Sequence, residues 1–333
     1  MNFATIGYVF GLEPKSIYSW YRNLLSGFAQ EVSSGEFHKH DMKHSDGSTL
    51  PVPILKPEHM GTSMVLDEKM INDEMYTILS NRETGKIALL AQTLRVEDLC
   101  ELATHFGDSI EQVQFLNSDM SPVYLKFCRT IFPNAMLTAD KFHVISQVLE
   151  SLQAVRIRLK AQEQAKLPTK KKKARQESQE TEPAEEVKRI ETRVEMLTRC
   201  RYLLFKRAKD WKPWQAVRAK RLFELFPELQ HAYKLVEQLR DWYDRKNIGK
   251  TWMGMEKNLL QWVEDVEIGG IAEMKGLVKM FEKHHDIILN YCITGQTNAK
   301  AENINSRIQR FINVNYGARD ENFFFFRLKK YYA

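Results

Sequence analysis

The sequence lacks any long apolar run, and it contains few cysteines. Its longest apolar stretches, such as residues 87–91, are far shorter than the roughly 20 residues that a membrane-spanning helix needs. Its amino terminus does not have the pattern of a signal peptide. The 333 residues include 4 cysteines, and no two of them have the close spacing of a zinc ribbon or a redox motif. We therefore expect a reduced, cytoplasmic protein with no membrane partner and no cysteine-based metal site.

Neither sign of charge dominates the whole sequence, but the two signs are unevenly distributed. The formal net charge is +6, from 49 basic and 43 acidic residues. Residues 57–145 carry 7 basic and 13 acidic residues, residues 146–289 carry 30 and 22, and residues 290–333 carry 7 and 3. An acidic block could bind cations while basic blocks attract a polyanion, and ordinary surface patterning explains the distribution equally well. With 43% hydrophobic residues, the length suggests two or three packed domains.

Residues 3–28 are expected to form two short helices. Gly11 and Pro14 mark the turn between them, because glycine tolerates a positive φ and proline suits the first turn of a helix. A helix-turn-helix and a plain helical hairpin fit this pattern equally well. Lys15 and Arg22 are the candidate DNA-binding residues here, and two basic residues are sparse for binding in a DNA groove.

Residues 31–61 have the composition of a linker, since they are rich in Ser, His, Gly and Pro. The polar side chains His38, His40, Asp41, His44 and Asp46 could ligate a metal. Their spacing matches no structural zinc site, so a polar, flexible segment is the favoured interpretation.

From residue 62 the pattern changes to strands that alternate with helices. Strands are expected at 63–67, 75–79, 87–90, 113–116 and 135–140, with helices at 96–106 and 121–131. Three of these strands end at or just before an aspartate: Asp67, Asp119 and Asp140. Ligands collect at the carboxyl ends of parallel strands, so we expect such carboxylates to share one edge of a sheet.

Carboxylates gathered in this way suit phosphodiester chemistry. Two divalent cations about 3.5–4 Å apart activate the attacking oxygen and stabilise the leaving oxygen. Mg²⁺ prefers hard oxygen ligands, which two or three carboxylates on a rigid scaffold supply. For any single aspartate, capping of the following helix is the more common role, so the prediction depends on the set.

Residues 141–294 are expected to be helical, apart from residues 166–186. That segment has a run of four lysines followed by glutamates, and it has little to bury, so we expect it to be mobile. Five of the six tryptophans lie in this helical region. We expect most of them in its core, with base stacking by one or two as the alternative.

Two groups of short motifs carry a family resemblance. The first group is Asp67-Glu68, Asn117-Ser118-Asp119-Met120-Ser121-Pro122-Val123-Tyr124, Phe132-Pro133-Asn134-Ala135 and Ala139-Asp140-Lys141-Phe142-His143-Val144-Ile145. The second group is Thr297-Asn298-Ala299-Lys300-Ala301-Glu302-Asn303-Ile304-Asn305, Tyr316-Gly317 and Glu321-Asn322-Phe323. In this order they resemble insertion-sequence transposases of the ISL-three family, over about residues 62–330 apart from the variable helical stretch.

The resemblance implies an α/β fold: a ribonuclease-H-like catalytic domain with a mixed sheet, interrupted by a large all-α insertion. The implied domains are a partial helix-turn-helix (1–30), a linker (31–61), the first part of the catalytic domain (62–145), the helical insertion (146–294) and the last part of the catalytic domain (295–333). The positive charge of the insertion suits contact with DNA ends or a second subunit. Its DNA-binding candidates are Arg156, Arg158 and Lys160, near a run of lysines that a solvated linker explains equally well.

The resemblance also implies a DDE triad of Asp67, Asp119 and Glu302, which would act in catalysis and bind Mg²⁺ or Mn²⁺. Four further residues match family motifs and are accessory candidates: Asp140, His143, Asn298 and Asn303. For Asp140 and His143 the alternatives are a helix cap and a hydrogen-bonded core histidine, and for the asparagines helix capping or surface exposure. The four consecutive phenylalanines at 323–326 are expected to pack on the catalytic core, or to contribute to a subunit contact.

The expected function is therefore transposition: metal-dependent cleavage of transposon ends in double-stranded DNA and strand transfer to a target. A nuclease of the same fold and an inactive or domesticated DNA-binding protein are the alternatives. A homodimer or higher oligomer is expected, in the bacterial cytoplasm and associated with the nucleoid. Relatives usually begin with a cysteine-rich zinc-binding segment that this sequence lacks, so a separately encoded N-terminal DNA-recognition protein or a truncated copy is expected.

Overall fold

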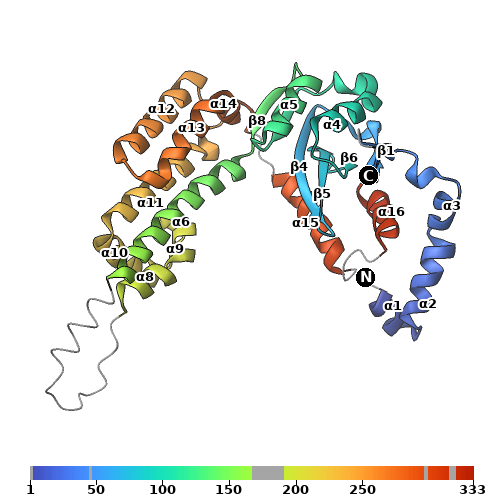
Figure 1. The fold of residues 1–333 in the computed structure, drawn as a ribbon, viewed down its shortest axis with the longest axis horizontal. Coiled ribbons are helices and arrows are strands. Elements are labelled where there is room, and N and C mark those ends of the chain that lie inside the picture. The colour runs from blue at the N-terminus through green and yellow to red at the C-terminus, as the bar shows by residue number, and fades with distance from the viewer. Residues whose placement is uncertain (1–2, 45–46, 167–190, 296–298, 315–319) are drawn as a thin grey trace, which may run out of the picture. The chain divides into compact units, whose positions relative to one another are not determined.

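The computed structural model describes residues 3–44, 47–166, 191–295, 299–314 and 320–333 (Figure 1). The chain divides into two compact units. The sheet unit contains Met1–Asp140 and Gln296–Ala333, and the helical unit contains Lys141–Gly295. The chain therefore enters the helical unit directly after Asp140 and returns to the sheet unit after Gly295.

The sheet unit is built on a six-stranded mixed sheet in the order β3-β6-β5-β4-β7-β8. The strands are β3 (Ile54–Leu55), β4 (Ser63–Ile71), β5 (Glu74–Asn81), β6 (Ile87–Ala91), β7 (Phe115–Ser118) and β8 (Met136–Ala139). β3, β6, β5 and β4 pair antiparallel, whereas β4, β7 and β8 pair in parallel. The five strands expected after residue 62 are all present, and their order is consistent with a ribonuclease-H-like sheet.

A tight turn joins β4 to β5 and lets β4 run further than expected. Asn72 and Asp73 both have a positive φ, of 51° and 63°. Asparagine and aspartate tolerate this conformation better than most residues, and a turn of this kind matches the twist of a hairpin. Because pairing with β5 continues as far as Ile71 opposite Glu74, β4 does not end at residue 67. Asp67 therefore lies within the strand.

Residues 31–61 differ from the expected linker. They contain a small sheet of β1 (Met42–Lys43) and β2 (Thr49–Leu50), followed by the edge strand β3. Leu50, Val52 and Ile54 are each at most 1% exposed. These few apolar residues pair with or pack on the main sheet, and so they make the segment part of the core despite its polar composition.

The histidines of this segment have ordinary polar partners. His38 Nδ1 lies 2.7 Å from Asp41 Oδ2, and His44 Nδ1 lies 2.8 Å from Asp98 Oδ2. Asp46 lies outside the described residues. The contact of His44 with Asp98 connects the cluster to α4 (Val96–Ala103) of the sheet unit.

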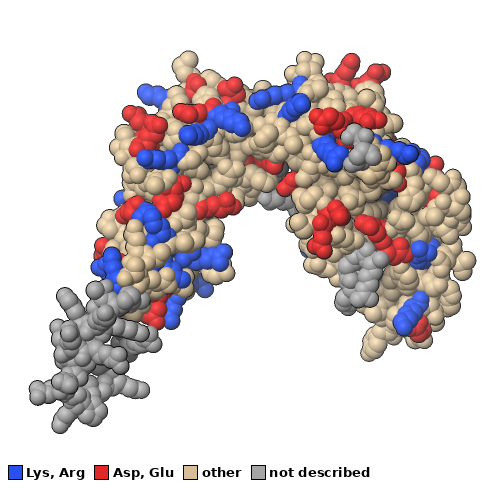
Figure 2. Space-filling view, in the orientation of Figure 1, with Lys and Arg blue, Asp and Glu red and all other residues tan. Residues whose placement is uncertain are grey.

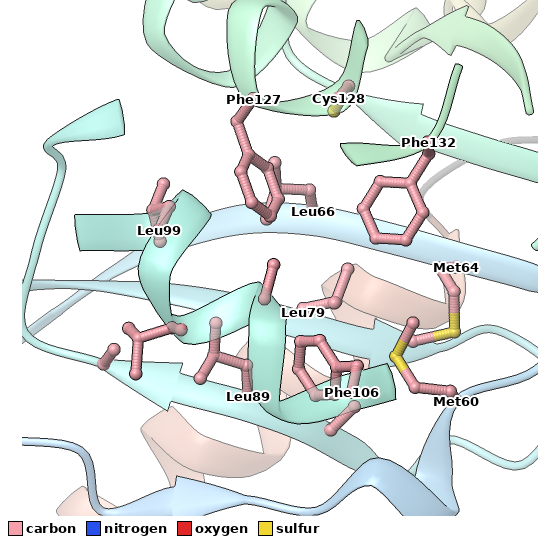
Figure 3. Packing of buried hydrophobic residues seen from close by; sticks show 14 of the residues in the cluster. Met60, Met64, Leu66, Leu79, Leu89, Leu99, Phe106, Phe127, Cys128 and Phe132 are labelled. Carbon is pink, nitrogen blue, oxygen red and sulfur yellow. The ribbon is translucent and has the colours of Figure 1, made fainter. Parts of the chain in front are cut away.

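One face of the sheet packs against α4 (Val96–Ala103) and α5 (Pro122–Ile131). Figure 3 shows Leu66 and Leu79 between the strands and the ring of Phe127. The rings of Phe127 and Phe132 meet edge to face with centroids 5.9 Å apart. This apolar layer fixes α5, the helix that follows Asp119.

The opposite face is covered by α15 (Ala299–Val314) and α16 (Glu321–Tyr332). Figure 1 shows α15 beside β4 and β5. Ile308 of α15 is fully buried against a cluster that includes Ile71, Tyr76 and Ile78. The expectation that Phe323–Phe326 pack on the core is confirmed, since the four side chains are 0–4% exposed.

Helices at the amino terminus complete the burial of α16. They are α1 (Phe3–Phe10), α2 (Pro14–Trp20), which continues as a π-helical turn over Tyr21–Leu25, and α3 (Phe28–Ser33). Gly11 has a φ of 65° and makes the expected turn between α1 and α2. The rings of Tyr18 and Tyr21 meet Phe323 with centroids 5.6 and 5.9 Å apart. These helices therefore pack onto the carboxyl-terminal helix.

The helical unit has its own core. Its helices are α6 (Lys141–Ala165), α8 (Arg193–Arg199), α9 (Arg201–Phe205), α10 (Pro213–Leu225), α11 (Pro227–Trp242), α12 (Trp252–Gly269), α13 (Lys275–Lys283) and α14 (His285–Thr294). Trp242 and Trp262 are buried, whereas Trp214 is 61% and Trp252 is 38% exposed. The expectation of core tryptophans therefore holds for only some of them. Apart from Lys166, the segment 166–186 lies outside the described residues.

Candidate active site

Three aspartates occupy one level of the parallel part of the sheet. The register pairs Leu66 of β4 with Ser118 of β7, and Ser118 with Ala139 of β8. Asp67, Asp119 and Asp140 each follow one of these paired residues directly. The main chains at the three aspartates therefore lie next to one another on adjacent strands, as the sequence led us to expect.

The alternation of side chains along β4 decides which face Asp67 occupies. Met64 and Leu66 belong to the apolar layer under α4 and α5, so Asp67 and Lys69 lie on the opposite face. Lys69 Nζ donates a hydrogen bond of 2.9 Å to Gln309 Oε1 of α15. Asp67 therefore faces the side of the sheet that α15 covers.

The three carboxylates differ in exposure and in local contacts. Asp140 is only 2% exposed, whereas Asp67 and Asp119 are half-buried. Asp119 Oδ1 accepts a hydrogen bond of 2.9 Å from the backbone N–H of Ser121, at the start of α5. The N-cap of α5 is Ser121, and its side chain forms no capping hydrogen bond, so this contact is an Asx turn that precedes the helix and not the capping role considered as an alternative. It fixes the orientation of the Asp119 carboxylate.

A buried hydroxyl pair lies beneath these carboxylates. Tyr124 of α5 is 1% exposed, and its hydroxyl lies 3.0 Å from Thr77 Oγ1 of β5. Thr77 Oγ1 donates its one proton to the carbonyl of Thr93 at 2.5 Å, so Tyr124 must be the donor to Thr77. Burial raises the pKa of Tyr124 above its usual range, and the charges of Glu68, Asp119 and Asp67 raise it further. The phenol therefore stays protonated.

Tyr124 links α5 to β5 on the face of the sheet opposite to Asp67. It lies five residues after Asp119, and its partner Thr77 pairs with Glu68, the residue after Asp67. Sequence analysis did not single out Tyr124 or Thr77. The available signal was that Tyr124 closes the motif that contains Asp119.

The Tyr124→Phe variant is expected to keep the fold, because a phenyl ring fills the same space and Thr77 keeps its bond to Thr93. We expect the free energy of unfolding of the sheet unit to fall by about 1 kcal/mol, because one buried hydrogen bond is lost. Urea denaturation followed by circular dichroism measures this. Tyr8→Phe in the same unit is the matched control, because Tyr8 is 91% exposed and its variant should change the free energy of unfolding by less than about 0.5 kcal/mol. Equal stabilities of the two variants would show that the buried hydroxyl pair does not stabilise the sheet unit.

The remaining predicted active-site residues are only partly described. Glu302 and Asn303 lie on α15, although the positions of their side chains are not described, and Asn298 lies outside the described residues. His143 lies in the first turn of α6 and is half-buried. The structure therefore brings together the backbones at Asp67, Asp119 and Asp140, and it locates Glu302 only by its helix.

The predicted DNA-binding residues have mostly internal contacts. Lys15 is exposed, but Arg22 forms an ion pair with Asp320 at 2.5 Å and stacks over Phe28. Arg22 therefore ties the amino-terminal helices to α16. It was read as a DNA contact because this long-range partner is not visible in the sequence.

The candidates on α6 are likewise engaged. Arg156 is 7% exposed, and its guanidinium donates to Gln153 Oε1 at 2.7 Å and to the carbonyl of Leu197 at 3.0 Å. Burial lowers its pKa. Arg158 lies between the carboxylates of Glu228 and Glu273, and these bonds raise its pKa. Lys160 is half-buried.

These contacts correct the expectation that Arg156 and Arg158 are available to DNA. Arg156 follows Leu152 by four residues and therefore lies on the buried stripe of α6. That spacing was the signal that sequence analysis missed.

The chemistry of the carboxylates fits a divalent cation only in part. Within the described ranges, no group of three or more His, Cys, Asp or Glu side chains could hold a metal ion. Asp67 and Asp119 nevertheless supply hard oxygen ligands at adjacent strands. The third expected ligand is Glu302, whose side chain lies outside the described part of the structure. The residues present are thus compatible with a site that is completed from α15.

Comparison with known proteins identifies the family. In the parts of the chain that the structure describes, no helix combines the length and apolarity needed to cross a membrane. No curated protein and no solved structure matched the sequence. A family model of ISL3-type DDE proteins, described as transposase, matches residues 64–328, which include the three aspartates and Glu302. The match covers most of the chain, and the chain therefore belongs to the ISL3 family of transposases.

Proposed function

We propose that this protein cleaves DNA strands at transposon ends and joins them to target DNA, with Asp67, Asp119 and Glu302 as the essential carboxylates. The observation that carries the proposal is the register of the parallel strands β4 and β7, in which Leu66 pairs with Ser118, so that Asp67 and Asp119 each come directly after a paired residue. Family membership supports the same chemistry. Transposases act on double-stranded DNA, so DNA is the proposed partner.

The position of α15 supports the assignment of Glu302. Gln309 of α15 accepts a hydrogen bond from Lys69, which lies two residues after Asp67 on the same face of β4. Glu302 precedes Gln309 by seven residues, and residues seven apart share one side of a helix. The position of Glu302 is therefore on the same side of α15 as Gln309, which contacts Lys69 of β4.

The carboxylates have two tasks in this proposal. Asp67, Asp119 and Glu302 would hold Mg²⁺ or Mn²⁺, which supplies stabilisation for the negative charge that develops on the phosphate. The N–H of Ser121 keeps the Asp119 carboxylate in one orientation, so little reorganisation is needed when the ligands converge. Asp140, buried at the same level of the sheet, would adjust the electrostatics of the site from β8.

Pairing of two DNA ends requires more than one active site, so we propose that the active form is a homodimer or a higher oligomer. A separately encoded DNA-recognition protein would supply the sequence-specific contacts. Neither proposal changes the assignment of the carboxylates.

The test is incubation of the purified chain with labelled insertion-sequence ends, a supercoiled target plasmid and Mg²⁺, with and without a candidate recognition protein. We expect metal-dependent cleavage at the ends and joined products in the target. Cleavage without joined products would favour a nuclease of the same fold. Retained DNA binding without any cleavage, in a folded protein, would favour an inactive DNA-binding relative and overturn the proposal.

A further inference from the structure

The densest positive charge among the described residues lies at one end of the helical unit. Residues 199–221 contain nine basic residues and a single acidic residue, Asp210. They span the end of α8, all of α9, the loop after it and most of α10. Figure 1 shows α8, α9 and α10 together at one end of the helical unit. This segment alone accounts for a net charge of +8.

Internal contacts hold the segment in one shape. Glu191 accepts hydrogen bonds from both Arg199 and Arg218, which brings the end of α8 against α10. Trp211 Nε1 donates to the carbonyl of Leu203 in α9 at 3.1 Å, and its ring stacks on Tyr233 with centroids 5.2 Å apart. The loop between α9 and α10 is therefore pinned to both the helix before it and to α11.

Most of the remaining basic side chains are exposed, so they do not contribute to the core of the helical unit. Within the described ranges, none of six exposed cations has an ion-pair partner: Arg201, Lys206, Lys209, Lys212, Lys220 and Arg221. Figure 2 shows Lys and Arg side chains over this end of the helical unit, with Asp and Glu side chains among them. An excess of exposed, unpaired cations attracts a polyanion.

Exposed aromatic side chains lie among these cations. Tyr202 is 73% and Trp214 is 61% exposed, and the guanidinium of Arg201 lies 5.6 Å from the ring centroid of Tyr202. Large aromatic rings on a basic surface suit contact with sugars and bases of a nucleic acid. Arg156 and Arg158, by contrast, are engaged inside the unit and contribute no such surface.

We infer that these six cations with Tyr202 and Trp214, here named the basic surface, bind the backbone of double-stranded DNA. The inference rests on the proposed function, because it assigns a contact surface for the DNA that this transposase would process. It moves the DNA contact of the helical unit from α6, where the sequence located it, to α9 and α10. A short rigid segment delivers several phosphate contacts at little entropic cost.

The experiment measures binding of the full chain to a fluorescent duplex of about 30 base pairs across a range of salt concentrations. EDTA is present throughout, so the result does not depend on metal or cleavage. In the triple variant Lys212→Gln, Lys220→Gln, Arg221→Gln, the slope of log K against log salt should fall in magnitude by about 2.7, since each phosphate contact contributes about 0.9. The affinity at about 0.1 M salt should fall by more than about tenfold.

The matched control is Lys275→Gln, Lys279→Gln, Lys283→Gln on α13, where the three lysines are also exposed. It removes the same charge from the same unit and should leave the slope almost unchanged. A second variant, Trp214→Ala, should lower the affinity by about fivefold with an unchanged slope, because the contact of an apolar ring with the sugars of the backbone is not electrostatic.

Three results would overturn the inference. They are equal effects of the two triple variants, absence of DNA binding by the native chain, and tighter binding of polyglutamate than of the duplex. Failure of the cleavage proposal would leave these binding results standing, and the reverse also holds, so the two can be distinguished.

Discussion

The Asp119→Asn variant is expected to lose metal-dependent DNA cleavage by roughly a thousandfold or more. Removal of one charged ligand from a cation site forfeits several kcal/mol of transition-state stabilisation, and each 1.4 kcal/mol is about tenfold in rate. The fold should survive, because the amide oxygen of asparagine can still accept the hydrogen bond from the N–H of Ser121. The rate of end cleavage at saturating Mg²⁺, measured on a gel with labelled ends, checks this expectation.

The matched control for this variant is Asp73→Asn. Asp73 is exposed in the turn after β4, where its φ of 63° suits asparagine equally well. The same chemical change elsewhere in the sheet unit should therefore leave cleavage unaltered. Wild-type cleavage by Asp119→Asn would rule out its role as a ligand, and loss of cleavage in both variants would point to a general effect of charge.

The Phe326→Ala variant is expected to destabilise the sheet unit by about 3–5 kcal/mol, the usual cost of removing a buried ring from a core. Phe326 is fully buried, and its ring centroid lies 5.2 Å from that of Phe28 and 6.1 Å from that of Phe323. Its loss leaves a cavity between α16, the amino-terminal helices and the sheet. Urea denaturation followed by circular dichroism measures the change in the free energy of unfolding.

An exposed phenylalanine in the same unit separates the effect of the cavity from the loss of an aromatic ring. Phe10 in α1 is 69% exposed, so Phe10→Ala should change the free energy of unfolding by less than about 0.5 kcal/mol. Similar free energies for the two variants would show that the carboxyl-terminal helix contributes little to the stability of the sheet unit.

The strand and helix order of residues 62–140 could be predicted from the sequence because its signals are local. Apolar runs such as 87–91, the glycine of the β5–β6 loop and the proline at the start of α5 each act over a few residues. The positions of Asp67 and Asp119 after apolar segments could be found in the same way. Their alignment followed from parallel pairing, which the alternation of strand and helix favours.

The boundaries that failed depended on long-range pairing. The linker composition of 31–61 concealed β3, whose two residues are a strand only because β6 pairs with them. Asp67 was expected at the end of a strand, but β5 continues to pair with β4 beyond it. A pairing partner lies elsewhere in the chain, so local composition carries no signal for it.

By itself, the sequence determined the family, the alternation of strands and helices, and which carboxylates lie in the family motifs. Only the tertiary structure decided which cations remain available. Arg22, Arg156 and Arg158 looked like DNA contacts in the sequence, yet each is held by a partner many residues away. Whether a charged side chain is neutralised depends on what the fold packs beside it, and that is why the structure was needed to identify which cations of α9 and α10 form the basic surface.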